Sequence, residues 1–84
     1  DHNPQVVIYP NPANNDLTIK TTTDFEMLQV QVRDLAGKVC KIAAFDKVDA
    51  NIPLTINVSD IEPGIYFISC VSHKWQITIP LLLR

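Results

Sequence analysis

Residues 28–34 read LQVQVRD, and this strict alternation constrains the fold more than any other feature of the chain. Its apolar residues, Leu28, Val30 and Val32, fall on one side of an extended chain, and the polar residues between them fall on the other. In a helix the same side chains would be scattered around the circumference. The segment therefore predicts a β-strand with one buried face and one face in water.

Six further apolar stretches, two before this segment and four after it, are separated by turn signals at intervals of roughly 8–12 residues, which is typical of a β-sandwich. The seven expected strands span residues 5–9, 16–21, 28–34, 38–45, 54–58, 65–72 and 75–83. Val, Ile and Thr supply 24 of the 84 residues and Ala only 5, and β-branched side chains favour sheet over helix. We expect an all-β fold, a seven-stranded immunoglobulin-like antiparallel β-sandwich.

Composition bounds the organisation and the partners of the chain. Eighty-four residues suffice for one domain, which we expect at residues 5–84 after a linker stub at residues 1–4. Seven scattered Lys and Arg residues against nine Asp and Glu give a net charge of −2, which excludes a nucleic-acid-binding surface. No apolar run approaches the roughly 20 residues of a membrane helix, so we expect no membrane insertion, and we expect a monomer.

Three local signals refine the sandwich. Asp34 can accept hydrogen bonds from the amides of the following turn, and Gly37 can adopt the positive φ that a tight hairpin requires. Tyr66 follows a Pro63-Gly64 corner, where it is either a tyrosine corner bonded to the backbone or a core residue with its hydroxyl at the rim. Pro80 interrupts the last strand, so that strand is expected at a sheet edge or to bend there.

The chain offers no evident catalytic or metal site. His2 and His73 have no cluster of further ligands around them in the sequence, and we assign both a structural role. Asp34, Asp60 and Glu62 occupy turns, where capping of backbone amides is the expected role. Two glycines cannot build a phosphate-binding loop. We expect no enzymatic activity, no cofactor and no bound metal.

Two further features leave alternatives open. Cys40 and Cys70 both fall on apolar sides of their predicted strands, and they either remain free thiols or form a disulfide that closes a loop of roughly 30 residues. Trp75 begins the last strand, where it either closes the end of the core or forms an exposed platform for a sugar ring.

Three motifs give the chain a resemblance to a known family. Residues 7–19, VIYPNPANNDLTI, are similar to the opening VYPNP…xLxI of the C-terminal sorting domains of the type IX (Por) secretion system. Residues 34–39, DLAGKV, resemble the family's DxxGRxV signature, with Lys38 in place of Arg. Residues 59–66, SDIEPGIY, look like its third signature, which leads into the penultimate strand.

The resemblance implies a non-catalytic immunoglobulin-like domain at the C-terminus of a secreted protein. Such a domain directs an N-terminal cargo in the same chain through the periplasm and across the outer membrane, to the medium or the cell surface. Its implied partners are the outer-membrane secretion machinery and a sortase-like peptidase that removes the domain. The motif residues, which mainly build the fold, are Tyr9, Pro10, Asn11, Pro12, Asp34, Gly37, Lys38, Gly64 and Tyr66. Family members commonly end in a basic strand, whereas the last strand here is followed by one cation, Arg84.

The alternative hypothesis is an immunoglobulin-like accessory module that binds a glycan or a protein on a secreted or surface protein. It predicts an exposed aromatic patch that contains Trp75 and Phe25 or Phe45. Burial of these aromatic side chains against the core would count against it.

Overall fold

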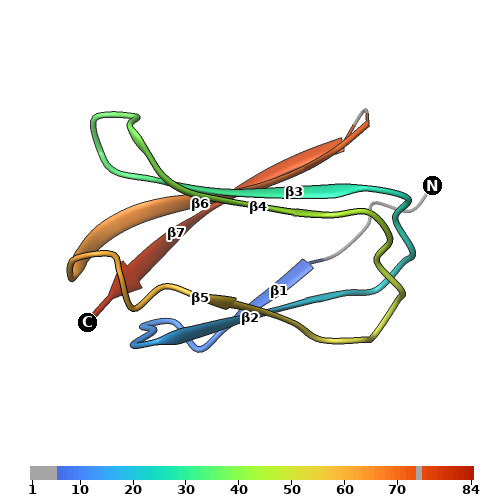
Figure 1. The fold of residues 1–84 in the computed structure, drawn as a ribbon, viewed down its shortest axis with the longest axis horizontal. Helices are drawn as coiled ribbons and strands as arrows, with labels where there is room; N and C mark the ends of the chain where they lie inside the picture. Colours follow the sequence, from blue (N-terminus) through green and yellow to red (C-terminus); the bar gives the residue numbers. More distant parts are fainter. Residues whose placement is uncertain (1–5, 74) are drawn as a thin grey trace.

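Two antiparallel β-sheets face each other across one apolar core in the computed structural model, which describes residues 6–73 and 75–84 (Figure 1). All regular elements in these two ranges are strands. They are β1 (Val6–Tyr9), β2 (Asp16–Thr21), β3 (Leu28–Arg33), β4 (Val39–Phe45), β5 (Leu54–Asn57), β6 (Gly64–Ser72) and β7 (Trp75–Leu83). The predicted seven-stranded sandwich is confirmed, and each strand begins and ends within one residue of its expected position.

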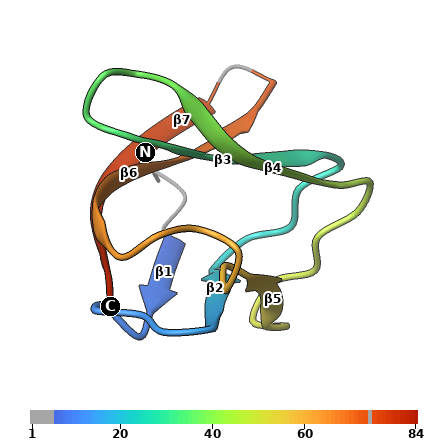
Figure 2. The ribbon, with the colours of Figure 1, turned by 60° about the vertical axis from the view of Figure 1, so that its left-hand side comes forward.

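The strands divide into a three-stranded sheet of order β1-β2-β5 and a four-stranded sheet of order β4-β3-β6-β7. Figure 2 shows the two sheets as separate layers. The order is that of an immunoglobulin-like sandwich whose fourth strand has joined the sheet of the third, sixth and seventh strands. β6 is paired on both sides, as its continuous apolar run predicts, and β7 lies at a sheet edge, as Pro80 predicts.

The core is formed by the inward-facing residues of both sheets. Leu17 and Ile19 of β2 are fully buried, and they face Leu28, Val30 and Val32 of β3 in one apolar cluster. A fully buried Leu, Ile or Val contributes about 1.5–3 kcal/mol relative to an exposed one, so these alternating positions specify which side of each strand faces inward. The polar residues of β3 lie half-buried on the opposite side, which confirms the expected alternation.

The expected orientation of β4 is wrong. The side of the strand that carries Cys40 was expected to be a buried apolar side, but Cys40, Ile42 and Ala44 on this side are exposed, whereas Lys41, Ala43 and Phe45 lie half-buried on the inner side. A bulge explains the difference, because Arg33 pairs with Val39 and Val32 pairs with Lys41, which leaves Cys40 as the extra residue. A shift of one residue exchanges the two faces of a strand.

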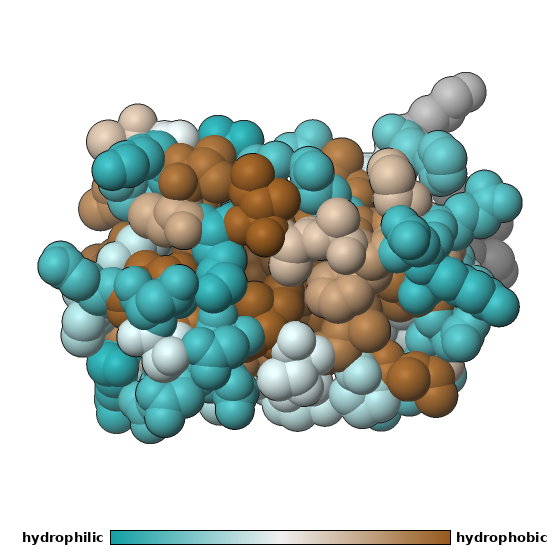
Figure 3. Space-filling view, in the orientation of Figure 1, coloured by the Kyte–Doolittle hydropathy of each residue, from teal (hydrophilic) through white to brown (hydrophobic). Residues whose placement is uncertain are grey.

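Apolar side chains also reach the surface. In the space-filling view, brown apolar residues show through the middle of the face, and teal hydrophilic residues gather towards its two ends (Figure 3). The more exposed of the large apolar side chains include Leu35, Ile65, Ile42 and Ile52.

Candidate functional site

Four separate segments of the chain meet at one end of the sandwich. Tyr9 and Asp16 flank the turn between β1 and β2, Asp16 pairs with Asn57 at the end of β5, and Gly64 pairs with Leu83. Both ribbon views place these turns, the hairpin after β3 and the C-terminus on the same side (Figures 1 and 2). We call this side the motif end, formed by residues 10–15, 34–38, 58–64 and 80–84. The three sequence motifs therefore lie together in space.

The hairpin at residues 34–38 is held by its first side chain. Asp34 Oδ1 accepts hydrogen bonds of 2.9 Å from the amide of Ala36 and of 2.9 Å from the amide of Lys38. The Asp34 amide in turn donates to the Lys38 carbonyl at 2.9 Å. Gly37 has a φ of 89°, a conformation that L side chains rarely adopt. The expected roles of Asp34 and Gly37 are thus confirmed, and Asp34 Oδ1 serves two amides of the turn.

Tyr66 forms a tyrosine corner. Its hydroxyl donates a hydrogen bond of 2.6 Å to the carbonyl of Glu62, while the ring is buried in the core cluster beside Gly64. Partial desolvation raises the pKa of the Tyr66 hydroxyl, and the negative charges that Cys40, Glu62 and Asp34 carry when deprotonated raise it further. The phenol therefore remains a donor at neutral pH and fixes the loop before β6.

Asn11 joins the first motif to the last strand. Its Nδ2 donates to the carbonyl of Pro80 at 3.1 Å, and its Oδ1 accepts from the amide of Leu82 at 3.1 Å. The backbone of Ala13 continues this pairing, because its amide donates to the Leu82 carbonyl and its carbonyl accepts from the Arg84 amide, both at 2.9 Å. Residues 11–13 thus add a short parallel segment to the edge of β7. We call this contact the Asn11 strap.

Local sequence patterns did not predict the strap, although they singled out its motif. Sixty-nine residues separate Asn11 from Pro80. Pro80 leaves the edge of β7 without one amide donor, and the two prolines that flank Asn11 disfavour a regular central strand there. These two signals together are the ones that could have pointed to the contact. The peptide bonds before Pro10 and Pro12 are both cis.

An ion pair connects β4 to the loop before β6. Lys41 Nζ lies 3.0 Å from Asp60 Oδ1, so the inward-facing cation of this edge strand reaches a carboxylate of the motif end. The Lys41 ammonium, together with a hydrogen bond from the backbone amide of Asp60, holds the pKa of that carboxyl below its ordinary value. Beside this pair lies a hollow of about 370 Å³, lined by residues from the second and third motifs, including Asp34, Glu62 and Tyr66.

The two cysteines are free thiols on different sides of the four-stranded sheet. Cys40 is exposed on β4 and Cys70 is buried on β6, and β3 lies between these strands. The disulfide that the sequence left open is not formed in this structure, because β3 separates the two strands and Cys40 faces away from the core. Burial raises the pKa of the Cys70 thiol to about 11, which keeps it protonated.

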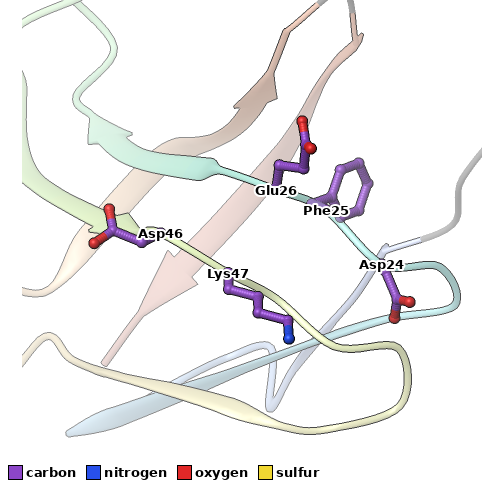
Figure 4. Close-up of a pocket in the computed structure, with 5 residues that line it drawn as sticks. All are labelled: Asp24, Phe25, Glu26, Asp46 and Lys47. Atoms are coloured by element: carbon purple, nitrogen blue, oxygen red, sulfur yellow. The ribbon is translucent and has the colours of Figure 1, made fainter.

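The opposite end of the sandwich contains a second hollow, of about 390 Å³ (Figure 4). The segments at residues 24–26 and 46–47 face each other across it. Asp24 Oδ1 accepts a 2.6 Å hydrogen bond from the Ala50 amide, so this carboxylate already has a partner within the fold. His73 lies at the same end, with Nε2 3.6 Å from Glu26 Oε1, while His2 lies outside the described residues.

The aromatic side chains of the alternative hypothesis pack inward. Phe25, Phe45 and Trp75 are half-buried and contact the core cluster, and the Phe25 and Trp75 rings lie 5.1 Å apart, centroid to centroid. An open stacking platform for a sugar requires exposed ring faces. The packing of these aromatics therefore counts against a glycan-binding module.

Within the described residues, no three His, Cys, Asp or Glu side chains are grouped to hold a metal ion. The same residues contain no helix that is long and apolar enough to cross a membrane.

Fold and motif end together define a class: a small immunoglobulin-like β-sandwich whose characteristic turns meet the last strand at one end. A family model described as the secretion system C-terminal sorting domain matches residues 7–83. The chain belongs to this family of type IX secretion C-terminal sorting domains, which confirms the resemblance of its motifs. A search of curated proteins gave no match.

Proposed function

We propose that this domain directs a cargo in the same polypeptide through the periplasm and across the outer membrane, to the medium or the cell surface, and that it does so without catalysis. The family match over residues 7–83 carries this proposal. The motif end supports it, because a signal that is read by a receptor needs a defined surface, and three motifs and the last strand meet there.

The course of the chain suits an N-terminal cargo. Val6, the first described residue of β1, pairs with Thr21, and β1 then runs towards the motif end. A cargo joined ahead of β1 through the predicted linker at residues 1–4 would leave the sandwich at the opposite end. The motif end would then stay accessible to the secretion machinery, while the sortase-like peptidase that we expect to remove the domain would cut between cargo and domain at the other end.

A reporter fusion tests the proposal. Residues 1–84 are joined to the C-terminus of a periplasmic reporter and expressed in a bacterium with a type IX system and in a matched strain that lacks the translocon. We expect reporter at the surface or in the medium of the first strain and retention in the periplasm of the second. Retention in both strains would contradict the proposal.

A further inference from the structure

The outer face of the four-stranded sheet has an unusual charge pattern. Along β3, β4, β6 and β7, which the structure describes throughout, Arg33 is the one charged residue among the outward-facing positions. Charged residues nevertheless make up 19% of the whole chain. The water-facing side of an antiparallel sheet is usually polar, and a face almost without charge is typical of a surface that another molecule covers.

Next to the motif end this face is apolar. Ile65 pairs with Leu82 across β6 and β7, and the neighbouring pair on the same face is Phe67 with Pro80. Ile65 is 58% exposed, Leu82 39% and Phe67 38%. Cross-strand neighbours two residues apart on one face lie within side-chain reach, so these four residues form one continuous patch. We call it the Ile65 patch.

A hollow lies on each side of Ile65. One, of about 260 Å³, is lined by Asn11, Ile65 and residues 80–82, and the other, of about 320 Å³, by residues 34–36 and 64–66. Each hollow is lined in part by a polar side chain that already has hydrogen-bond partners within the domain. In the first, the Asn11 side chain is hydrogen-bonded to Pro80 and Leu82, and in the second, Asp34 Oδ1 accepts from two turn amides. What these hollows offer a ligand is therefore chiefly apolar surface.

Arg33 borders the Ile65 patch, because it pairs with Phe67 across β3 and β6. Its guanidinium donates to Gln31 Oε1 at 2.5 Å and to the Gly37 carbonyl at 3.3 Å, and no carboxylate of the described residues forms an ion pair with it. A guanidinium has five N–H donors, so Arg33 retains capacity for a carboxylate from outside the domain.

We propose that the Ile65 patch is the docking surface for a protein of the secretion machinery, which inserts apolar side chains on either side of Ile65 and places a carboxylate against Arg33. The inference rests on the proposed function and adds the surface and the chemistry of the partner. It is favoured because the patch adjoins all three motifs, through Asn11, Asp34 and Ile65, and because Arg33 sets the sign of the charge that a partner must bring.

Ile52 provides a matched control. It is also an isoleucine and is 55% exposed. It lies at the opposite end of the sandwich, just before the start of β5, whose first residue, Leu54, pairs with Ile19. The variants Ile65→Lys and Ile52→Lys are compared in the reporter fusion, after thermal melting has shown that both remain folded. We expect Ile65→Lys to lower export by about tenfold or more, as at an interface hot spot, and Ile52→Lys to leave it unchanged.

The charge is tested separately. Arg33→Glu is expected to lower export, because it reverses the charge that faces the partner. Arg33→Lys is expected to retain most of the export, because lysine keeps the positive charge, although it lacks the planar guanidinium. Export of Ile65→Lys or of Arg33→Glu at the wild-type level would overturn the docking surface, while export of the unmodified fusion would still uphold the proposed function. Equal loss in Ile52→Lys would overturn it too, since the effect would not belong to the patch.

Photo-cross-linking identifies the occupant. A photoreactive amino acid is placed at position 65 or 52 of the fusion in secreting cells, and products are identified by mass spectrometry. A cross-link from position 65, but not 52, to a protein of the secretion machinery supports the proposal. A product that contains a second copy of this chain or a lipid would overturn it.

Discussion

The hydroxyl of Tyr66 donates a 2.6 Å hydrogen bond to the carbonyl of Glu62, four residues earlier in the chain. This contact closes the loop that leads into the central strand β6, and it places the Pro63-Gly64 corner beside the Tyr66 ring. Because the ring is buried, replacement of the hydroxyl leaves a backbone carbonyl without its partner.

Tyr66→Phe is therefore expected to destabilise the domain by about 1–2 kcal/mol without changing the fold. For a domain of this size such a loss lowers the melting temperature by roughly 4–8 °C per kcal/mol. Circular dichroism melting of the two proteins provides the measurement. An unchanged melting temperature would show that this bond adds nothing to stability.

Removal of the Asn11 side chain should loosen the edge of β7. Asn11→Ala loses the hydrogen bonds to Pro80 and Leu82, and we expect a destabilisation of about 1–2 kcal/mol. The local consequence is faster hydrogen exchange at the Leu82 amide, measured by NMR. Asn11→Asp is the control, since it keeps the acceptor for Leu82 but loses the donor to Pro80. If exchange at Leu82 is equally slow in all three proteins, the strap does not hold the strand.

The Lys41–Asp60 ion pair predicts that the stability of the folded domain depends on pH at acidic values. The pKa of Asp60 is lower in the folded state than in the unfolded chain, so its contribution to stability is present above the unfolded value, about 3.9, and is lost as the pH falls through the folded pKa. An NMR titration of the Asp60 carboxyl carbon should give a midpoint below 3.9, and Lys41→Met should raise it towards the ordinary value. A midpoint that Lys41→Met leaves unchanged would rule out the ion pair as the main cause.

The two thiols should differ sharply in reactivity. A water-soluble disulfide reagent is expected to modify one thiol per folded chain, Cys40, and two after unfolding in guanidinium. Burial and the raised pKa of about 11 protect Cys70 in the folded state. Cys40→Ser should abolish the fast reaction and leave the slow one. Absence of any reactive thiol in unfolded, unreduced protein would instead reveal a disulfide.

Sequence patterns predicted those parts of the fold that depend on neighbouring residues. β3 separates apolar from polar residues at every position, so its orientation follows from the sequence alone. The Asp34 turn and the Tyr66 corner span only two to four residues, and their residue types indicate their geometry.

Three features escaped prediction for physical reasons. Apart from Lys41, every residue of β4 (VCKIAAF) is apolar or a cysteine, so the residue types do not indicate which face is buried. The bulge opposite Arg33 sets the orientation of the strand. The inward-facing Lys41 is stabilised by the ion pair with Asp60, which is distant in the sequence. The Asn11 strap joins residues at opposite ends of the chain, and no local pattern encodes such a pairing. The patch around Ile65 likewise depends on the register of β6 with β7.

The Asn11 strap has a consequence for the order in which the domain is made. A ribosome releases residues 11–13 long before the segment at 80–84 to which they are bonded. The first motif is therefore synthesised long before its structural partner, and the motif end can close only when the last strand has been synthesised. A chain that terminates before residue 80 would lack this closed end and with it the surface that we expect the translocon to read, so the placement of the strap couples the display of the signal to synthesis of the last strand.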